Sequence, residues 1–348
     1  IPYVEVVAAA ALPAIIYYVI LFAQVDLMAK DNNLKGIDRS KLPDFKFLLS
    51  KRGLHLFPIV LLIFLMFGIG LQPAKSALIS GFAAVICGFF MSDSNINHKD
   101  INPFMQSVSQ TLIPIILIGG AAGIIVGVLN VTGLGFNLTL GLTDIGNQYG
   151  LLVMLFLTGI VAIILGMGMP TAAVYIVLSV VLAPAVIEMG VPVLAAHLFI
   201  FYFGLLSMIT PPVAVASFVA AGIAGSSLWK TSFTAIKLGI AAYLLPFLFV
   251  YNDSLLFKGS WAEILNIFFT CLISGLILSH VLRGNSIKSL KEIIIIGLYL
   301  FSSLLIGSST LWLGRDSNYI YMMMVFGILV LYSITRISTL KSSEKFYG

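Results

Sequence analysis

The chain alternates long apolar segments with short polar ones, and most of the apolar segments are long enough to cross a membrane. A helix of about 20 apolar residues spans the roughly 30 Å of hydrocarbon in a bilayer. The pattern therefore predicts an all-α, polytopic integral membrane protein surrounded by the lipid bilayer. The predicted spans are 4–29, 53–72, 74–92, 104–131, 151–189, 192–225, 236–252, 261–282, 291–313 and 318–335.

Composition supports this class, with 60% hydrophobic and 9% charged residues and a mean hydropathy of +1.09. In such a chain the excess positive charge of +5 indicates which loops face the cytoplasm. We therefore expect no nucleic-acid partner. Cys87 and Cys271 lie in apolar segments, which predicts neither a disulfide framework nor a transition-metal site. The chain starts at Ile1 without a basic leader, so we expect it to be the C-terminal part of a longer protein.

Lysine and arginine positions predict the orientation, because cytoplasmic loops are enriched in them. If the first span ends in the cytoplasm, the loop 30–52 holds seven of the nineteen. If 151–189 also enters and leaves by one face, sixteen lie inside and only Lys75, Lys258 and Arg315 lie outside. If 151–189 crossed the membrane only once, ten of the lysines and arginines would lie inside and nine outside. This even division does not fit the expected cytoplasmic excess, so a single crossing is rejected. The loop 30–52 and the C-terminus are therefore predicted to be cytoplasmic.

The segment 151–189 contains a break that an ordinary membrane helix would lack. In "LGMGMPTAAVY", which starts at Leu165, two glycines let the backbone turn, and Pro170 removes the helical partner of the Gly166 carbonyl. Two full crossings fit the charges equally well, but the turn is almost devoid of polar groups and would make a poor water-facing loop. We predict a re-entrant hairpin with its tip near the middle of the membrane, inside protein or a water-filled cavity.

A second break lies in "FYFGLLSMITPPVAVASF", which starts at Phe201. The proline pair that begins at Pro211 should free the carbonyls of Ser207 and Met208, and Ser207 and Thr210 add hydroxyls at the same level. Unpaired carbonyls are costly in hydrocarbon, so we expect a dehydrated monovalent cation as their partner. Discontinuous helices that face each other near the midplane indicate the binding site of a secondary transporter.

Together the GMGMPT and TPP motifs resemble the second half of the large membrane subunit of TRAP transporters, the tripartite ATP-independent periplasmic transporters, of the fused 4TM/12TM type. The opening "IPYVEVVAAAALPAIIYYVILFAQVDLMAKDNNLKGI" and the later "LGIAAYLLPFLFVYNDSLL" resemble the same family, so the likeness covers roughly residues 1–257. It implies an elevator-type secondary transporter with inverted repeats in a bacterial or archaeal inner membrane. A periplasmic binding protein would deliver the substrate, and symport with Na⁺ would import it.

The resemblance also implies a division of the chain. Its parts are the end of the first repeat and a cytoplasmic linker (1–52), scaffold helices (53–103), transport-domain elements (104–225), the last core helix (226–257) and a three-span extension (258–348). Within the transport domain, 151–189 would be the second hairpin and 192–225 the second broken helix. The first repeat, with the other ion site, and a small-subunit-like part would largely be missing from this sequence.

By the same resemblance, one cation site is formed by the two breaks. Its residues would be Gly166, Gly168, Pro170, Thr171, Ser207, Met208, Thr210 and Pro211. Contacts to a substrate carboxylate would come from Met169, Thr171, Tyr175 and Thr210. Many relatives have an acidic residue just before the tip proline, where this chain has Met169, so both Na⁺ and H⁺ stay open as the coupling ion. No other cofactor is expected.

Five other polar residues lie in or near the predicted spans. His197 is an ionisable residue in a membrane segment, which favours function by default, but it starts its helix near the predicted outer interface. Glu188 is interpreted as an interface marker rather than a proton carrier. Asn130 and Asn137 flank "VTGLGF", which predicts a turn into an interfacial arm helix. Tyr175 lies one turn beyond Thr171, where packing and substrate contact are both open.

Other functions were compared with symport of small organic anions. The sequence lacks HExxH, GxSxG, P-loop and dinucleotide motifs, which argues against an enzyme. An ion channel would be expected to repeat its filter around a symmetric pore. A non-transporting scaffold or assembly subunit, and another ion-coupled carboxylate transporter of the same superfamily, are the alternatives. Carboxylates, amino acids and sugar acids all stay open as substrates.

Overall fold

The computed structural model describes residues 1–34, 36, 38, 47, 53–90 and 101–282, and the regular structure within them is helical throughout. The predicted spans 291–313 and 318–335, and most of the predicted linker, lie outside the described residues. The described chain divides into two compact units. One holds residues 1–8 and 33–125, and the other holds 9–32 and the described residues from 126 onward.

Two described helical segments, Tyr3–Asp31 and Leu228–Tyr251, are long and apolar enough to cross a membrane. A third is added if the bent pair Gly119–Leu129 and Leu134–Tyr149 counts as one span. Several of the other predicted spans are divided into apolar helices of 10–17 residues. The hydrophobic pattern therefore located the apolar segments but did not show where their helices are interrupted.

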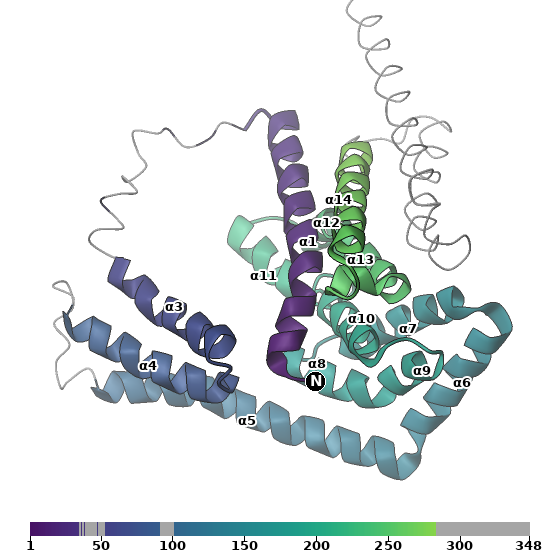
Figure 1. The fold of residues 1–348 in the computed structure, drawn as a ribbon, viewed down its shortest axis with the longest axis horizontal. Helices are drawn as coiled ribbons and strands as arrows, with labels where there is room; N and C mark the ends of the chain where they lie inside the picture. The colour runs from purple at the N-terminus through teal and green to yellow at the C-terminus, as the bar shows by residue number, and fades with distance from the viewer. Residues whose placement is uncertain (35, 37, 39–46, 48–52, 91–100, 283–348) are drawn as a thin grey trace, which may run out of the picture. The chain divides into compact units, whose positions relative to one another are not determined.

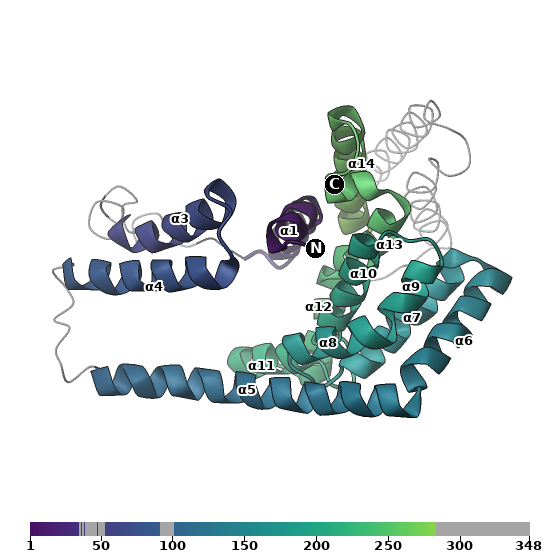
Figure 2. The same ribbon diagram turned by 60° about the horizontal axis from the view of Figure 1, so that its bottom comes forward.

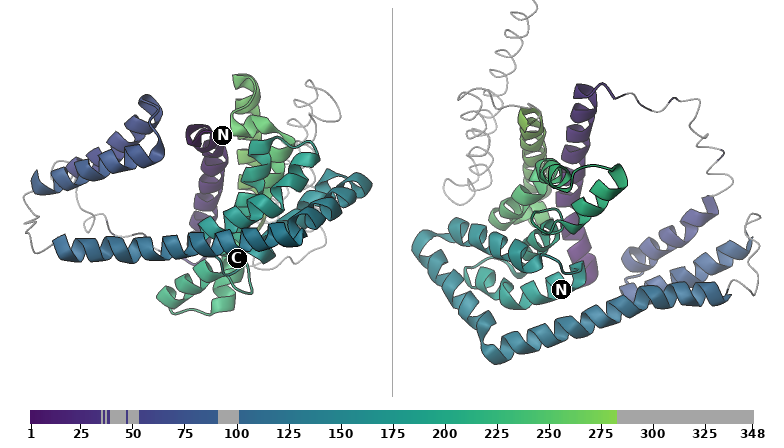
Figure 3. Two further views of the ribbon diagram at one scale, coloured as in Figure 1. Left: turned by 90° about the horizontal axis from the view of Figure 1, so that it is seen from below. Right: turned by 180° about the vertical axis from the view of Figure 1, so that it is seen from behind.

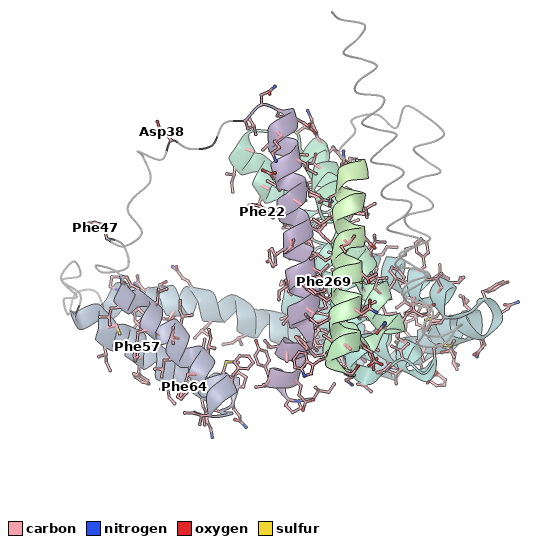
Figure 4. The ribbon with its side chains drawn as sticks, turned by 45° about the horizontal axis from the view of Figure 1, so that its top comes forward. Phe22, Asp38, Phe47, Phe57, Phe64 and Phe269 are labelled. Carbon is pink, nitrogen blue, oxygen red and sulfur yellow. The ribbon has the colours of Figure 1, made fainter. Side chains whose placement is uncertain are left out.

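The first unit contains η2 (Gly53–Leu56), α3 (Phe57–Ile63), the π-helical turn η3 (Phe64–Gly68), α4 (Pro73–Phe90) and most of α5 (Ile101–Thr132). A proline lies in the first turn of α3, where its missing N–H has no helical acceptor to lose. The chain turns at Gly70, where φ is +75°, and α4 packs against α3 (Figure 1). Phe57 on α3 and Phe64 in η3 are exposed apolar side chains (Figure 4).

The second unit holds the residues that the sequence singles out. Its elements are most of α1 (Tyr3–Asp31), α6 (Leu134–Tyr149), α7 (Leu151–Gly166), α8 (Thr171–Val181), α9 (Ala183–Glu188), α10 (Val193–Leu206), α11 (Val215–Ala224), α12 (Leu228–Leu238), α13 (Ile240–Tyr251), η5 (Asp253–Leu256) and α14 (Trp261–Leu282). Gly133 at φ +66° separates α5 from α6, and Gly150 at φ +89° separates α6 from α7 (Figure 3). The helix interruption predicted at "VTGLGF" is confirmed.

Helix α10 forms the core of this unit. It packs against α7, α8, α9 and α13 (Figure 2), and most of its side chains are buried. The rings of Phe199, Phe203 and Phe247 contact one another with centroids 4.8 to 5.6 Å apart. A helix that is apolar on every side is typical of a buried core element. The first half of the predicted broken helix is therefore the most enclosed part of the unit.

Helices α1 and α14 run side by side in the same unit (Figure 4). Gly275 lets them approach closely, because a Cβ atom there would overlap the side chain of Ile20. Phe22 on α1 and Phe269 on α14 are 75% and 52% exposed. Small residues at a helix contact and large apolar residues outside it suit helices that face lipid.

Candidate functional site

The first break lies between α7 and α8. Helix α7 ends at Gly166 and α8 begins at Thr171, so residues 167–170 form the turn. Gly168 adopts φ +77°, a left-handed conformation that residues with a Cβ avoid, while Met167 and Pro170 are extended. Glycine and proline therefore interrupt the helix where the sequence predicted.

The two arms of this turn run along α10 in opposite directions. On α7, Gly159 faces Phe203 and Gly166 faces Ser207, so α7 follows the direction of α10. On α8, Thr171 meets Met208 and Val174 meets Gly204, so α8 runs the other way. Segments α7 and α8 therefore form a helical hairpin whose turn meets the second break.

The second break separates α10 from α11. Helix α10 ends at Leu206 and α11 begins at Val215, and the proline pair occupies the middle of the loop 207–214. Ala214 closes the loop at φ +35° and is fully buried. The predicted broken helix is thus two helices joined by an eight-residue loop, rather than one kinked helix.

Backbone hydrogen bonding corrects part of the sequence argument. The Gly166 carbonyl accepts a bond from the Met169 N–H at 3.4 Å, and the Met208 carbonyl accepts one from the Ala216 N–H at 3.0 Å. The prediction that prolines leave these two carbonyls unpaired is wrong, because each carbonyl finds another backbone N–H. Met169 supplies one from within the turn, and Ala216 supplies the other from the start of α11. Within the described residues the Ser207 carbonyl accepts no hydrogen bond, as predicted.

The hydroxyls of the two breaks lie around this meeting point. The Ser207 hydroxyl, 1% exposed, donates to the Gly204 carbonyl at 2.6 Å. The exposed Thr171 hydroxyl has only a long contact of 3.8 Å to the sulfur of Met208. A Cβ atom added to Gly166 would lie 2.8 Å from the Ser207 oxygen, so glycine is what allows the hairpin to reach this loop. The structure brings Thr171 against Met208 and Gly166 against Ser207, and their assignment to a cation site stays a prediction.

Tyr243 on α13 is a site residue that sequence reasoning missed. Its hydroxyl lies 2.6 Å from the Thr210 Oγ1, which donates to the Leu206 carbonyl at 2.6 Å, so the phenol donates to the threonine. Ile209 also packs over Gly239, between α12 and α13. The apolar segment 236–252 contains Tyr243 and Tyr251, and Tyr243 inside it was the available signal, since a buried phenol usually finds a partner.

The comparison with protein families decides the identity. Residues 1–264 match the family described as tripartite ATP-independent periplasmic transporter, DctM component. The chain belongs to this DctM family. No curated protein and no solved structure matches the chain. The predicted resemblance to the large TRAP permease subunit is therefore confirmed.

The DctM family is one of transporters rather than enzymes, and its members are integral membrane permease subunits that work with a periplasmic binding protein and a small permease subunit. The matched residues include both breaks and the whole of α13. The segment from 265 onward, which includes most of α14, lies beyond the match.

Other predicted residues of this DctM-family chain lie away from the meeting point. The Tyr175 hydroxyl is 3.0 Å from Nδ1 of His197, on the side of α8 that faces α10. Glu188 is exposed and accepts a hydrogen bond of 3.2 Å from Thr143 on α6. Among the described residues, no side-chain hydrogen bond joins either pair to the loop 207–214. No group of three metal-ligating His, Cys, Asp or Glu side chains occurs in the part of the chain that the structure describes.

Proposed function

We propose that this DctM-family chain imports small organic anions by symport with Na⁺ or H⁺, after delivery by a periplasmic binding protein. The observation that carries the proposal is the contact between the hairpin turn and the loop 207–214 inside one compact unit. Contact between two interrupted helices is the arrangement in which secondary transporters bind ions and substrate.

The cation site lies where the hairpin meets the loop. Oxygen ligands suit hard cations, and the Ser207 carbonyl and the Thr171 hydroxyl are among the oxygens of the two breaks that the protein engages little. Thr210 lies in the same loop as Ser207, and its hydroxyl is hydrogen-bonded to that of Tyr243. The site as a whole consists of Gly166, Gly168, Pro170, Thr171, Ser207, Met208, Thr210 and Pro211. It contains neutral groups only, so it favours Na⁺ over H⁺.

The anion binds beside the cation, at the N-terminus of α8. Helix α8 begins at Thr171 and is 11 residues long, and the N–H groups of its first turn have no acceptor within the helix. Such an end carries partial positive charge, to which a bound Na⁺ adds. Met169, Thr171 and Thr210 flank this position and are assigned to the carboxylate.

Transport follows an elevator mechanism in this proposal. The hairpin, α10 and α11 carry the bound ions, while the helices of 53–103 act as the scaffold on which they move. Binding of cation and anion together neutralises charge, which lowers the cost of moving the site past lipid. The hairpin is re-entrant, and it opens toward the periplasm on the topology that the lysines and arginines predict.

The test is uptake into proteoliposomes that contain the chain with its partner subunits, its binding protein and an imposed Na⁺ or pH gradient. The double variant Thr171→Val, Thr210→Val should lower uptake by about tenfold or more, equivalent to roughly 1.4 kcal/mol of lost binding. Thr158→Val is the matched control, because the Thr158 hydroxyl is buried on α7 and bonds only within its own helix.

Three results would contradict the proposal. Unchanged uptake by the double valine variant would remove the site assignment. Flux that only dissipates a gradient would indicate a channel, and no flux at all would indicate a scaffold subunit.

A stimulation of uptake by a pH gradient alone would assign H⁺ as the coupling ion.

A further inference from the structure

Tyr175 and His197 form a polar pair between the second arm of the hairpin and α10. The phenol oxygen lies 3.0 Å from Nδ1 of the imidazole, and the two ring centroids are 6.1 Å apart. The Tyr175 ring also meets Phe201 edge-on, at 5.5 Å and 87°. Both members of the pair are half-buried. A phenol that donates to Nδ1 of a neutral histidine leaves the ring proton on Nε2.

Helix α8 has few directional contacts with its surroundings. Among the described residues, two side-chain hydrogen bonds join α8 to other elements, and both go to α10 or the loop that follows it. One is the long contact from Thr171 to the Met208 sulfur, which is a weak acceptor. The other is the Tyr175–His197 bond, so this pair supplies the stronger directional contact.

The remaining contact between α8 and α10 is apolar. Val174 and Leu178 fill the space above Gly204, where a Cβ atom would lie 2.7 Å from Val174 and 3.0 Å from Leu178. This packing brings the helices close, but apolar contact is non-directional and constrains sliding and rotation less than a hydrogen bond does. Tyr175 lies one turn from Thr171, on the same helix.

We propose that Tyr175 and His197 are positioning residues that set the register of α8 on α10. They hold Thr171 over Met208 and the loop 207–214, so they control the affinity for the coupling cation and not the maximal rate. Neither residue contacts the ions directly. This inference rests on the proposed function for its transport readout, but the seating of the hairpin can be measured without transport.

The experiment compares Tyr175→Phe, His197→Leu and the double variant in the reconstituted transporter. Each single change should raise the half-saturating Na⁺ concentration by about threefold to tenfold with little change in maximal uptake. Each leaves one polar partner unpaired, whereas the double variant removes both. The double variant should therefore be no worse than the worse single variant. Additive effects, or a loss confined to maximal rate, would overturn the proposal.

Two further variants keep the result interpretable. His197→Asn retains an acceptor near the position of Nδ1 and should transport more like wild type than His197→Leu. Tyr202→Phe removes a phenol from α10 whose ring packs against Phe249, on α13 rather than α8, and it should have no effect. If His197→Asn and His197→Leu are equally impaired, the hydrogen bond is not what matters and the proposal fails.

Cross-linking separates this inference from the proposed function. Thr171→Cys and Met208→Cys, with Cys87 and Cys271 changed to serine, should react efficiently with a short bifunctional thiol reagent. Tyr175→Phe should lower the yield by about half or more, since register is lost. Unchanged yield would overturn the positioning role. Lower yield, together with no cation-dependent uptake by the wild-type transporter, would reject the proposed function alone.

Discussion

The two breaks that meet in the second unit differ in what holds them. The hairpin turn, 167–170, is four residues long, and its backbone bonds are local, from Met167 to Ile164 and from Met169 to Gly166. The loop 207–214 is longer and is tied to its neighbours through the bond of Thr210 to Tyr243 and the packing of Ile209 on Gly239.

The backbone conformations of the two breaks also differ. The turn places glycine at its left-handed position, Gly168 at φ +77°, and this residue is exposed. The loop places the buried Ala214 at φ +35°, a strained conformation for a residue with a Cβ. Such strain persists only where the surroundings dictate the conformation. We infer that the loop is a fixed platform and that the turn is the part that adjusts when ions bind.

The largest effect should come from filling the contact between the two breaks. Gly166→Val would place side-chain atoms against Ser207 and the Gly204 carbonyl. It would therefore push the hairpin turn away from the loop 207–214. We expect uptake to fall to background and stability to drop by about 1–3 kcal/mol, as overpacking typically costs. Gly222→Ala is the control, since nothing lies within 4 Å of a Cβ there. Near-normal uptake by Gly166→Val would mean that the breaks need not touch.

A smaller effect is expected from the conformation of the turn itself. Gly168→Ala meets no atom within 4 Å, but alanine disfavours φ +77° by roughly 1–2 kcal/mol, so we expect the exposed turn to shift away from this conformation instead of carrying the strain. Because the turn is the adjustable break, this should reduce uptake several-fold while the melting temperature of the purified protein changes little. Gly168→Asn should be milder, since asparagine tolerates this region better. Equal uptake in glycine and alanine proteins would contradict a conformational role.

The smallest effect should come from loosening the platform. Tyr243→Phe removes the hydrogen bond to Thr210 and should lower the free energy of unfolding by about 0.5–1.5 kcal/mol. In contrast to Gly168→Ala, it should lower the melting temperature and raise the half-saturating Na⁺ concentration together. Tyr251→Phe, near the other end of α13, is the control. A change in uptake without any change in melting temperature would reject the platform interpretation.

Much of this arrangement could be predicted from the residues themselves. Glycine and proline have backbone limits that do not depend on the rest of the protein, so the breaks near Gly168, at the proline pair and at Gly133 were visible in the sequence. The grouping of Thr171 with the loop residues came from family resemblance and agrees with their contacts. Orientation, the re-entrant character of the hairpin and the coupling ion stay predictions.

Sequence alone indicates the apolar segments, the breaks at glycine and proline and the family, because hydrophobicity, backbone restriction and motif are properties of local sequence. The pairing of polar groups across elements became visible in the folded structure. Thr210 and Tyr243 are 33 residues apart, and Tyr175 and His197 are 22 apart. The folded structure also decided that the Gly166 and Met208 carbonyls are satisfied, since that depends on how each loop folds back. Such pairings depend on the distances between packed helices, which no local pattern specifies.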